Sequence, residues 1–323
     1  MRILGAVVAT ALCCAPVPSL ALEGSAAAGP IGGTDIRSSL PLPPGLYGGL
    51  IFAYAEGYRF NDGAGNVIPA FDDLELRRAR GAPFLIYVPD VQVLGGSVRA
   101  IATVPAGPEC GRLFATTPKR CIVGVGDPYV ELGWSRYFGT PRPSRYPGAF
   151  PIPEGLAVSV GFGVVIPTGK YDANDATLQG LSIGNNIWDF SPIVGFTYTT
   201  RPLLAEGTEI TGRLFWNNYL TNPATQYATG TLLNLDFAVS EHIGRVQAGL
   251  AGLYLTQIAD DKQFGIRLPP DGRRTELLEF GPVLAYDLPE YSSSMKIKAL
   301  KSVYSANILH AWGVVVGWIK KFD

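Results

Sequence analysis

Two long segments between residues 155 and 199 alternate bulky and small side chains, and they carry the clearest structural signal in the chain. From residue 156 to residue 166, every second position is Leu, Val, Val, Phe, Val or Ile. From residue 188 to residue 198, every second position is Trp, Phe, Pro, Val, Phe or Tyr. A period of two indicates β-strands. These strands are about twice the usual length of ~5–6 residues.

The positions between the bulky ones are small or polar, so each strand has two unlike faces. In a soluble sandwich, the apolar face would pack on a core and the polar face would meet water. In an outer-membrane barrel, the apolar face meets lipid and the polar face lines the lumen. These two segments alone do not distinguish the two architectures.

The rest of the chain supplies further strands with the same alternation. Twelve are predicted, at about 45–60, 83–89, 91–104, 122–139, 155–168, 186–201, 208–220, 229–241, 245–258, 275–288, 293–305 and 311–322. The links between them alternate in length. Long links span 61–82, 105–121, 169–185 and 259–274, with an intermediate one at 221–228; short links lie at 89–90, 202–207, 242–244 and 289–292.

This alternation of links favours a membrane barrel, because such barrels have short periplasmic turns and longer external loops. Two links break the rule: 140–154 is long where a short turn is expected, and 307–310 is short where a long loop is expected. Closing a sheet also satisfies every backbone polar group without water, as lipid requires. We therefore expect an all-β, antiparallel transmembrane barrel of about 12 strands over residues 45–323.

The segment before the barrel divides into two parts. Residues 1–21 have an early arginine, an apolar stretch and a small-residue end, which is the pattern of a signal peptide. Residues 22–44 are rich in Gly, Ala, Ser and Pro and show no periodicity. We expect this second part to be an N-terminal extension or a plug within the barrel, and the sequence does not choose between them.

Composition agrees with an exported membrane protein. Charged residues make up 16% of the chain and the net charge is −1, so there is no basic surface for nucleic acid. The expected location is the bacterial outer membrane, with outer-membrane lipid as the surrounding partner and a monomer as the favoured state. Beyond the signal, Cys110 and Cys121 lie close together in sequence, and an oxidising compartment favours a disulfide between them.

Candidate catalytic and metal motifs are weak. The stretch Gly163–Lys170 has the wrong spacing for a phosphate-binding loop, and Tyr171 replaces the Ser or Thr. His242 and His310 lie in no hydrolase or zinc motif, so no enzyme activity, cofactor or metal site is predicted. Asp172, Asn174 and Asp175 have spacing similar to a calcium loop but lack its Gly and Glu, and solvated loop tips are the favoured interpretation.

The polar faces of the predicted strands give a candidate set of lumen-lining residues. They are Asp127, Glu131, Asp189, Arg213, Asn217, Asn234, Asp236, Glu279, Asp287 and Lys296. Twelve strands fall between barrels filled by side chains and the wider open porins. Both a narrow pore and a lumen filled by a hydrogen-bonded network therefore fit the sequence.

Several stretches together resemble a known family. They are 40–47, 93–96, 124–128, 235–239, 257–262 and 280–286, and above all Gly161–Asp172 with its Pro-Thr-Gly-Lys-Tyr run and the downstream Ile183–Trp188. This combination resembles the outer-membrane transporter family labelled "putative MetA-pathway of phenol degradation", which includes sphingosine-responsive outer-membrane proteins. The resemblance spans roughly 40–323 and implies a barrel that passes hydrophobic or aromatic compounds, with no established catalytic residues.

From the pattern and the resemblance we expect an outer-membrane channel or transporter for small hydrophobic or aromatic compounds. The alternative is a non-conducting structural or adhesive barrel that binds ligands through its external loops. A third hypothesis, a membrane-embedded lipase, would require His242 or His310 to act in hydrolysis. The sequence does not identify the solute.

Overall fold

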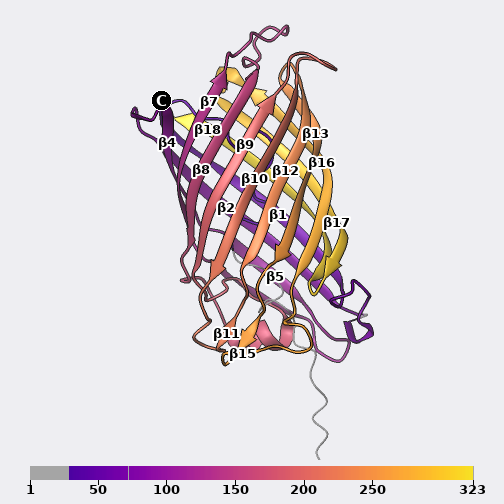
Figure 1. The fold of residues 1–323 in the computed structure, drawn as a ribbon. Coiled ribbons are helices and arrows are strands. Elements are labelled where there is room, and N and C mark those ends of the chain that lie inside the picture. Colours follow the sequence, from indigo (N-terminus) through magenta and orange to yellow (C-terminus); the bar gives the residue numbers. More distant parts are fainter. Residues whose placement is uncertain (1–28, 72, 323) are drawn as a thin grey trace, which may run out of the picture.

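A computed structural model describes residues 29–71 and 73–322, which form a closed, tilted β-barrel (Figure 1). The prediction of an antiparallel barrel of 12 strands is confirmed. The predicted signal peptide, residues 1–21, lies outside the described residues. No helix among the described residues has both the length and the apolar character needed to cross a membrane.

Twelve strands make up the barrel wall. They are β1 (Gly45–Phe60), β2 (Glu75–Val88), β4 (Gly96–Thr103), β7 (Tyr129–Gly139), β8 (Gly155–Val165), β9 (Asp189–Thr199), β10 (Thr208–Tyr219), β12 (Leu232–Ile243), β13 (Val246–Gln257), β16 (Glu276–Leu288), β17 (Ser293–Ala306) and β18 (Leu309–Phe322). Each pairs antiparallel with its neighbours, and the first and last strands close the barrel by pairing from Leu46↔Phe322 to Phe60↔Leu309. The short elements are β3 (Gln92–Val93), β5 (Ala106–Arg112), β6 (Arg120–Val125), β11 (Tyr227–Ala228), β14 (Lys262–Gln263), β15 (Ile266–Arg267), η2 (Pro69–Phe71), η3 (Asp175–Gln179) and η4 (Pro289–Tyr291).

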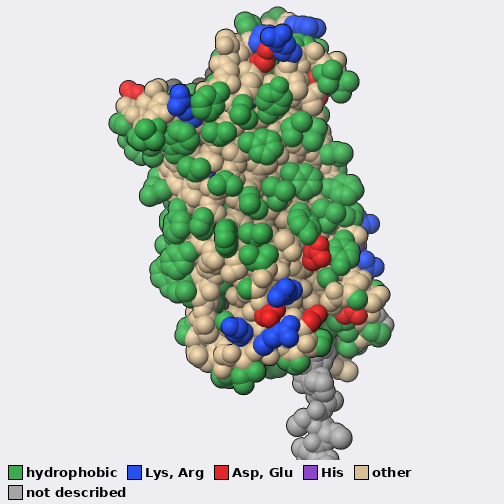
Figure 2. All heavy atoms as spheres, in the orientation of Figure 1, with side chains coloured by type: hydrophobic (Ala, Val, Ile, Leu, Met, Phe, Trp, Pro, Cys, Tyr) green, Lys and Arg blue, Asp and Glu red, His purple; other side chains and the backbone are tan. Residues whose placement is uncertain are grey.

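The period of two places bulky residues outside the barrel and small or polar residues inside it. In β8, Val160 and Phe162 are exposed on the outer surface, whereas Ala157 and Ser159 are buried inside. In β9, Val194, Phe196 and Tyr198 are exposed in the same way. Figure 2 shows hydrophobic side chains over the middle of one face, with Lys, Arg, Asp and Glu gathered toward its two ends. This surface matches an apolar membrane interior bounded by polar layers.

Loop lengths orient the barrel. The long connections 166–188, 220–231 and 258–275 lie at one end, and the short turns 244–245 and 289–292 lie at the other. Short turns are periplasmic in such barrels, so the long connections are external. Both exceptions predicted from the sequence occur: the long link 140–154 is periplasmic and the short link 307–308 is external.

Four boundaries predicted from the sequence are wrong. One is the predicted strand 122–139, which is two strands, β6 and β7, separated by residues 126–128. Strand β2 begins at Glu75, within the predicted link 61–82. The prediction missed this start because Arg77, Arg78 and Arg80 obscure the alternation of apolar and polar residues. The predicted strand 91–104 contains a turn at Leu94 and Gly95, which both have positive φ and join β3 to β4. The predicted link 105–121 is largely strand, because β5 continues β4 along β2 and pairs with β6.

Cys110 and Cys121 face each other across β5 and β6, where they form a disulfide. Their Cα atoms are 4.0 Å apart. The predicted pairing is therefore present, but it joins two paired strands instead of closing an irregular loop.

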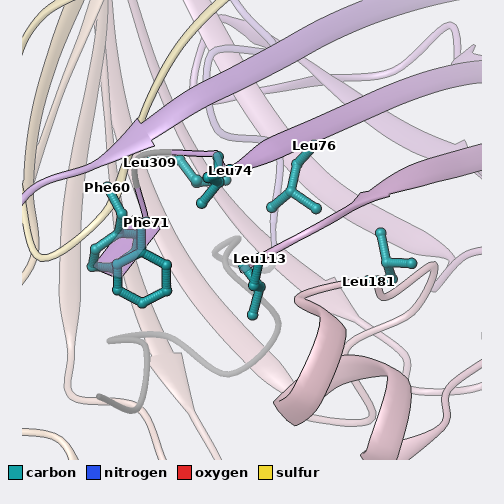
Figure 3. Packing of buried hydrophobic residues seen from close by; sticks show 7 residues of the cluster. All are labelled: Phe60, Phe71, Leu74, Leu76, Leu113, Leu181 and Leu309. Atoms are coloured by element: carbon teal, nitrogen blue, oxygen red, sulfur yellow. The ribbon is translucent and has the colours of Figure 1, made fainter. Parts of the chain in front are cut away.

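A hydrophobic cluster fills one side of the external end of the lumen (Figure 3). Its members come from the external ends of β1, β2, β5 and β18, from η2 and from the loop 166–188. They are Phe60, Phe71, Leu74, Leu76, Leu113, Leu181 and Leu309. Phe71 contacts two aromatic rings, with centroids 5.2 Å from Phe60 and 5.0 Å from Phe114. Because these segments are far apart in sequence, the cluster ties the external ends of the strands together.

One carboxylate joins the long periplasmic link 140–154 to the turn 244–245. Glu206 accepts hydrogen bonds from the Ser144 hydroxyl at 2.7 Å, the Arg145 N–H at 2.5 Å and the Gly244 N–H at 2.9 Å. Burial acts to raise the pKa of Glu206, but these hydrogen bonds outweigh it and hold the pKa below its usual value. The folded link therefore favours the ionised carboxylate.

We expect Phe71→Ala to lower the free energy of unfolding by about 3–5 kcal/mol, because it empties a fully buried position. Phe264→Ala is the matched control, because Phe264 is 72% exposed. Its effect should stay within about 0.5 kcal/mol. Guanidinium titration of the purified protein in detergent measures both, and equal effects of the two substitutions would contradict the packing described.

Acid should release the link 140–154. A lowered pKa in the folded state stabilises the fold above the ordinary carboxyl pKa, and that stabilisation is lost as pH falls through the lowered value. Pepsin cleavage near Tyr146 and Phe150, followed between about pH 5 and pH 2, should therefore begin only as Glu206 protonates. Glu206→Gln should be cleaved across the whole range; a variant that keeps the pH dependence of the wild type would contradict this role.

Candidate functional site

The inner wall of the barrel has two unlike sectors. The sector formed by β9, β10, β12, β13, β16 and β17 carries mainly polar side chains, and most of them are buried. A segment that precedes β1, residues 29–40, lies against this sector and covers it. The opposite sector, formed by β18, β1, β2 and β4, is mainly apolar and only half-buried.

Asp236 on β12 binds the start of the segment. Its carboxylate accepts hydrogen bonds from the Gly32 N–H at 3.0 Å, the Thr34 N–H at 2.9 Å and the Thr34 hydroxyl at 2.8 Å. The Asn234 side chain donates a further bond to the same carboxylate at 3.0 Å. One predicted lumen residue therefore binds this segment directly, and another supports it.

Two lysines on β17 form ion pairs with Asp35 of the segment. The Lys296 Nζ lies 2.5 Å from one carboxylate oxygen and the Lys298 Nζ lies 2.9 Å from the other. Lys298 also donates to the Gly32 carbonyl at 2.5 Å. The Asp35 side chain is fully buried, so these lysines compensate a charge that water does not reach.

The Arg37 side chain extends toward the periplasmic end of the same polar sector. Its guanidinium forms two parallel hydrogen bonds with Asp287, at 2.8 and 2.9 Å, and donates to the Gln247 side chain at 2.5 Å. The Arg37 N–H donates to Glu209 at 2.7 Å. Bidentate arginine–carboxylate pairs fix geometry as well as charge. Arg37 therefore holds the backbone and the side chain of the segment at once.

Hydroxyl groups complete the attachment at the periplasmic end. The Ser38 hydroxyl lies 2.9 Å from that of Thr211, and the Ser39 hydroxyl lies 2.8 Å from that of Ser159. A side chain at Gly195 would lie only 2.7 Å from the Ser39 hydroxyl, so glycine allows the segment to approach the wall. From Gly32 to Ser39, the segment is thus attached at almost every residue.

The other predicted lumen residues face inward but do not contact this segment in the same way. Glu131 pairs with Arg213 at 2.5 Å, and the Ser191 hydroxyl bridges Asp189 and Asn217. Glu279 accepts from the Ser302 hydroxyl at 2.6 Å. Asp127 is an exception, because it lies in the link 126–128 between β6 and β7 and not on a strand face; it accepts from the Gly169 and Asn185 N–H groups and so holds the external loop 166–188.

The apolar sector leaves space inside the barrel. Its inward positions are half-buried, and they are Ile51, Ala53, Ala55, Ala82, Phe84, Ile86, Ile101, Val315 and Ile319. At Gly317 on β18, an added Cβ atom would meet no other atom within 4 Å. The partner of Gly317 on β1 is Ile51, and the partner on β17 is Lys296, so this space lies between the apolar wall and the attached segment.

Neither histidine forms a catalytic arrangement. The His242 ring nitrogen lies 3.2 Å from Glu209 inside the polar sector. The His310 ring lies 3.2 Å from the Ser305 hydroxyl, but the Arg59 guanidinium is also 3.2 Å away. A neighbouring cation disfavours the imidazolium that a general base would become. Ser305 is also fully buried, so the hydrolase hypothesis gains no support.

The acidic loop residues do not form a metal site. The Asp172 carboxylate accepts the Asn174 and Asp175 N–H groups, and Asp175 pairs with Arg120 at 2.7 Å. Asp260 is paired with Arg267 and Arg274. Within residues 29–71 and 73–322, no group of three or more His, Cys, Asp or Glu side chains is arranged to hold a metal ion.

Sequence reasoning missed the partners of the predicted residues. Asp35 and Arg37 lie in a segment without periodicity, and the partners of their side chains are more than 200 positions away. The predicted lumen set includes Lys296 but not Lys298; the structure places both inside and Lys301 on the exposed outer face. Glu109, which pairs with Arg78 and Arg80 at 2.7 Å each, lay in a predicted link.

Comparison with known proteins gives a family and a fold. A family model described as "Putative MetA-pathway of phenol degradation" matches residues 57–316. The COG4313 outer membrane channel from Pseudomonas putida F1 is similar over 90% of this chain and 100% of that chain, with 13% identity and a TM-score of 0.70. The β domain of the Bordetella autotransporter BrkA matches 85% of this chain and 99% of that chain, with 9% identity and a TM-score of 0.47. No curated protein matches.

We expect Arg37→Leu to destabilise the protein, because it leaves the buried Asp287 carboxylate without its cationic partner. The free energy of unfolding should fall by about 3 kcal/mol. The double variant Arg37→Leu/Asp287→Asn removes the unpaired charge and should recover part of this loss. Guanidinium titration in detergent checks both, and a double variant less stable than the single one would contradict the explanation.

Proposed function

The chain belongs to the family described as "Putative MetA-pathway of phenol degradation", and we propose that it is an outer-membrane channel for small hydrophobic or aromatic compounds. Its bacterial outer-membrane location follows from the barrel and the family. The observation that carries the proposal is the half-buried apolar wall of β18, β1, β2 and β4, which faces open space at Gly317. An apolar solute gains free energy when it leaves water for such a wall, and its free energy changes little when it leaves lipid.

The residues before β1 act, in this proposal, as a partial plug that narrows the lumen. The contacts of Gly32, Thr34, Asp35, Arg37 and Ser39 occupy the polar sector, so a solute is left with the apolar sector. The predicted lumen residues would then set selectivity mainly by holding the plug. Asp236, Asp287 and Lys296 have this role directly. The barrel would act as a single copy.

The similarity to the COG4313 channel supports this proposal at the level of fold. The residues of the lumen wall agree with this proposal, because they offer a solute apolar surfaces to pack against. A channel needs no catalytic group. The solute would pass from the external hydrophobic cluster around Phe71 and Leu76, along the inner faces of β1 and β18, to the periplasmic end of the barrel.

A non-conducting barrel that binds ligands through its loops is the second candidate. Phe264 and Ile266 favour it, because each is 72% exposed at an external hairpin, where such apolar side chains are unusual without a partner. Ligand binding that depends on these two residues, without solute flux, would support this candidate over the channel.

We expect Gly317→Trp to lower solute uptake several-fold, because the indole would occupy the space between the apolar wall and the plug. Val316→Trp is the matched control, since Val316 is 37% exposed on the outer face of the same strand. Uptake into proteoliposomes and single-channel conductance measure the effect. Equal uptake by Gly317→Trp and Val316→Trp would place the path elsewhere, and no uptake by the wild type would overturn the channel proposal.

A further inference from the structure

One carboxylate inside the barrel is shared by two guanidinium groups. The Arg213 Nη2 of β10 lies 2.5 Å from Glu131 Oε1, and the Arg99 Nη2 of β4 lies 3.6 Å from the same oxygen. The other oxygen of Glu131 accepts from the Tyr129 hydroxyl at 2.8 Å. Both carboxylate oxygens of Glu131 therefore have partners. The two arginines and the one glutamate together leave one positive charge uncompensated.

Both arginines retain hydrogen-bonding capacity. The side chains of Arg99 and Arg213 are only 9% and 6% exposed. Their Nε atoms are buried and have no hydrogen-bond partner. A buried N–H group without an acceptor costs free energy, especially on a charged group. A carboxylate that reaches this position would supply both the missing acceptor and the missing negative charge.

The arrangement leaves one flank of Arg99 lined by glycine. Gly133 pairs with Arg99 across β4 and β7, and Gly161 pairs with Gly133 across β7 and β8. A methyl group at Gly133 would lie 3.1 Å from the Arg99 Nε, and one at Gly161 would lie 3.5 Å from Glu131 Oε1. Larger residues at either position would crowd the guanidinium–carboxylate pair.

The cluster lies at the border of the apolar wall. Arg99 is two positions from Ile101 on the inner face of β4, and Ile101 pairs with Ile86 of β2. A molecule lying along this wall would thus meet a guanidinium group at its edge. An apolar body with a terminal carboxylate fits both features, because the planar arginine fork matches carboxylate geometry.

We propose that Arg99, with Arg213, is a recognition site for the carboxylate of an amphipathic organic acid. This inference rests on the proposed channel function and names its solute class: an aromatic or aliphatic acid, recognised by charge and by an apolar body. A purely structural Arg–Glu–Arg cluster is the competing explanation. Such clusters affect stability without discriminating between ligands.

The test compares two aromatic probes of opposite charge, benzoate and benzyltrimethylammonium, by titration calorimetry on the purified barrel and by uptake into proteoliposomes. The wild type should bind and take up benzoate in preference to the cation. Arg99→Gln should weaken benzoate binding about tenfold, which is the loss of one charged hydrogen-bonded pair. Arg99→Lys keeps the charge but lacks the fork, so it should restore part of the affinity.

Arg136→Gln is the matched control, because Arg136 lies on the outer face of β7, where its guanidinium is over the Phe138 ring. It should leave benzoate affinity unchanged. Equal benzoate affinity in the wild type, Arg99→Gln and Arg99→Lys would overturn the carboxylate site. Benzoate binding that depends on Arg99 without uptake of either probe would instead overturn the channel proposal and leave the site intact.

Discussion

The requirement that every backbone polar group be satisfied within the membrane governs this structure. Lipid offers no hydrogen bonds, so a sheet can span it only if its two edges meet. Here the pairing of β1 with β18 closes the sheet along nearly its whole height. Once the sheet is closed, the period of two assigns each residue to lipid or lumen. The lumen then receives most of the polar side chains of the strands, and its width limits what else fits inside.

The lumen has a polar half covered by residues 29–40 and a half-buried apolar half, because its polar groups need partners. Carboxylates and ammonium groups inside a narrow barrel are costly unless they are paired. The chain supplies the partners from its own N-terminal segment, through Asp35 and Arg37. The other half carries fewer such groups, and its arginines on β2 and β4 are paired with Glu109 and Glu131. The buried charges and the half-buried apolar wall are therefore two consequences of one distribution of side chains.

The strands and their faces were predictable because alternation is local. The inward-facing residues, including Glu131 and Asp236, followed from the same pattern. Their partners were not predictable, because Arg37 and Asp287 are 250 positions apart and the segment around Arg37 has no periodicity. The early part of β2 was missed because its arginines are held inside by Glu109, a residue that lies on a strand hidden within an apparent link. Long-range charge pairing, not strand formation, is what sequence reasoning could not supply.

Pairing of the first strand with the last has a consequence for assembly. The wall is complete only where the final strand pairs with β1, and the segment before β1 has its partners on β12, β16 and β17. These contacts join residues more than 200 positions apart, which is the kind of contact that slows folding. The barrel therefore encloses residues that precede its first strand, and the strand that completes this enclosure is the last one in the chain.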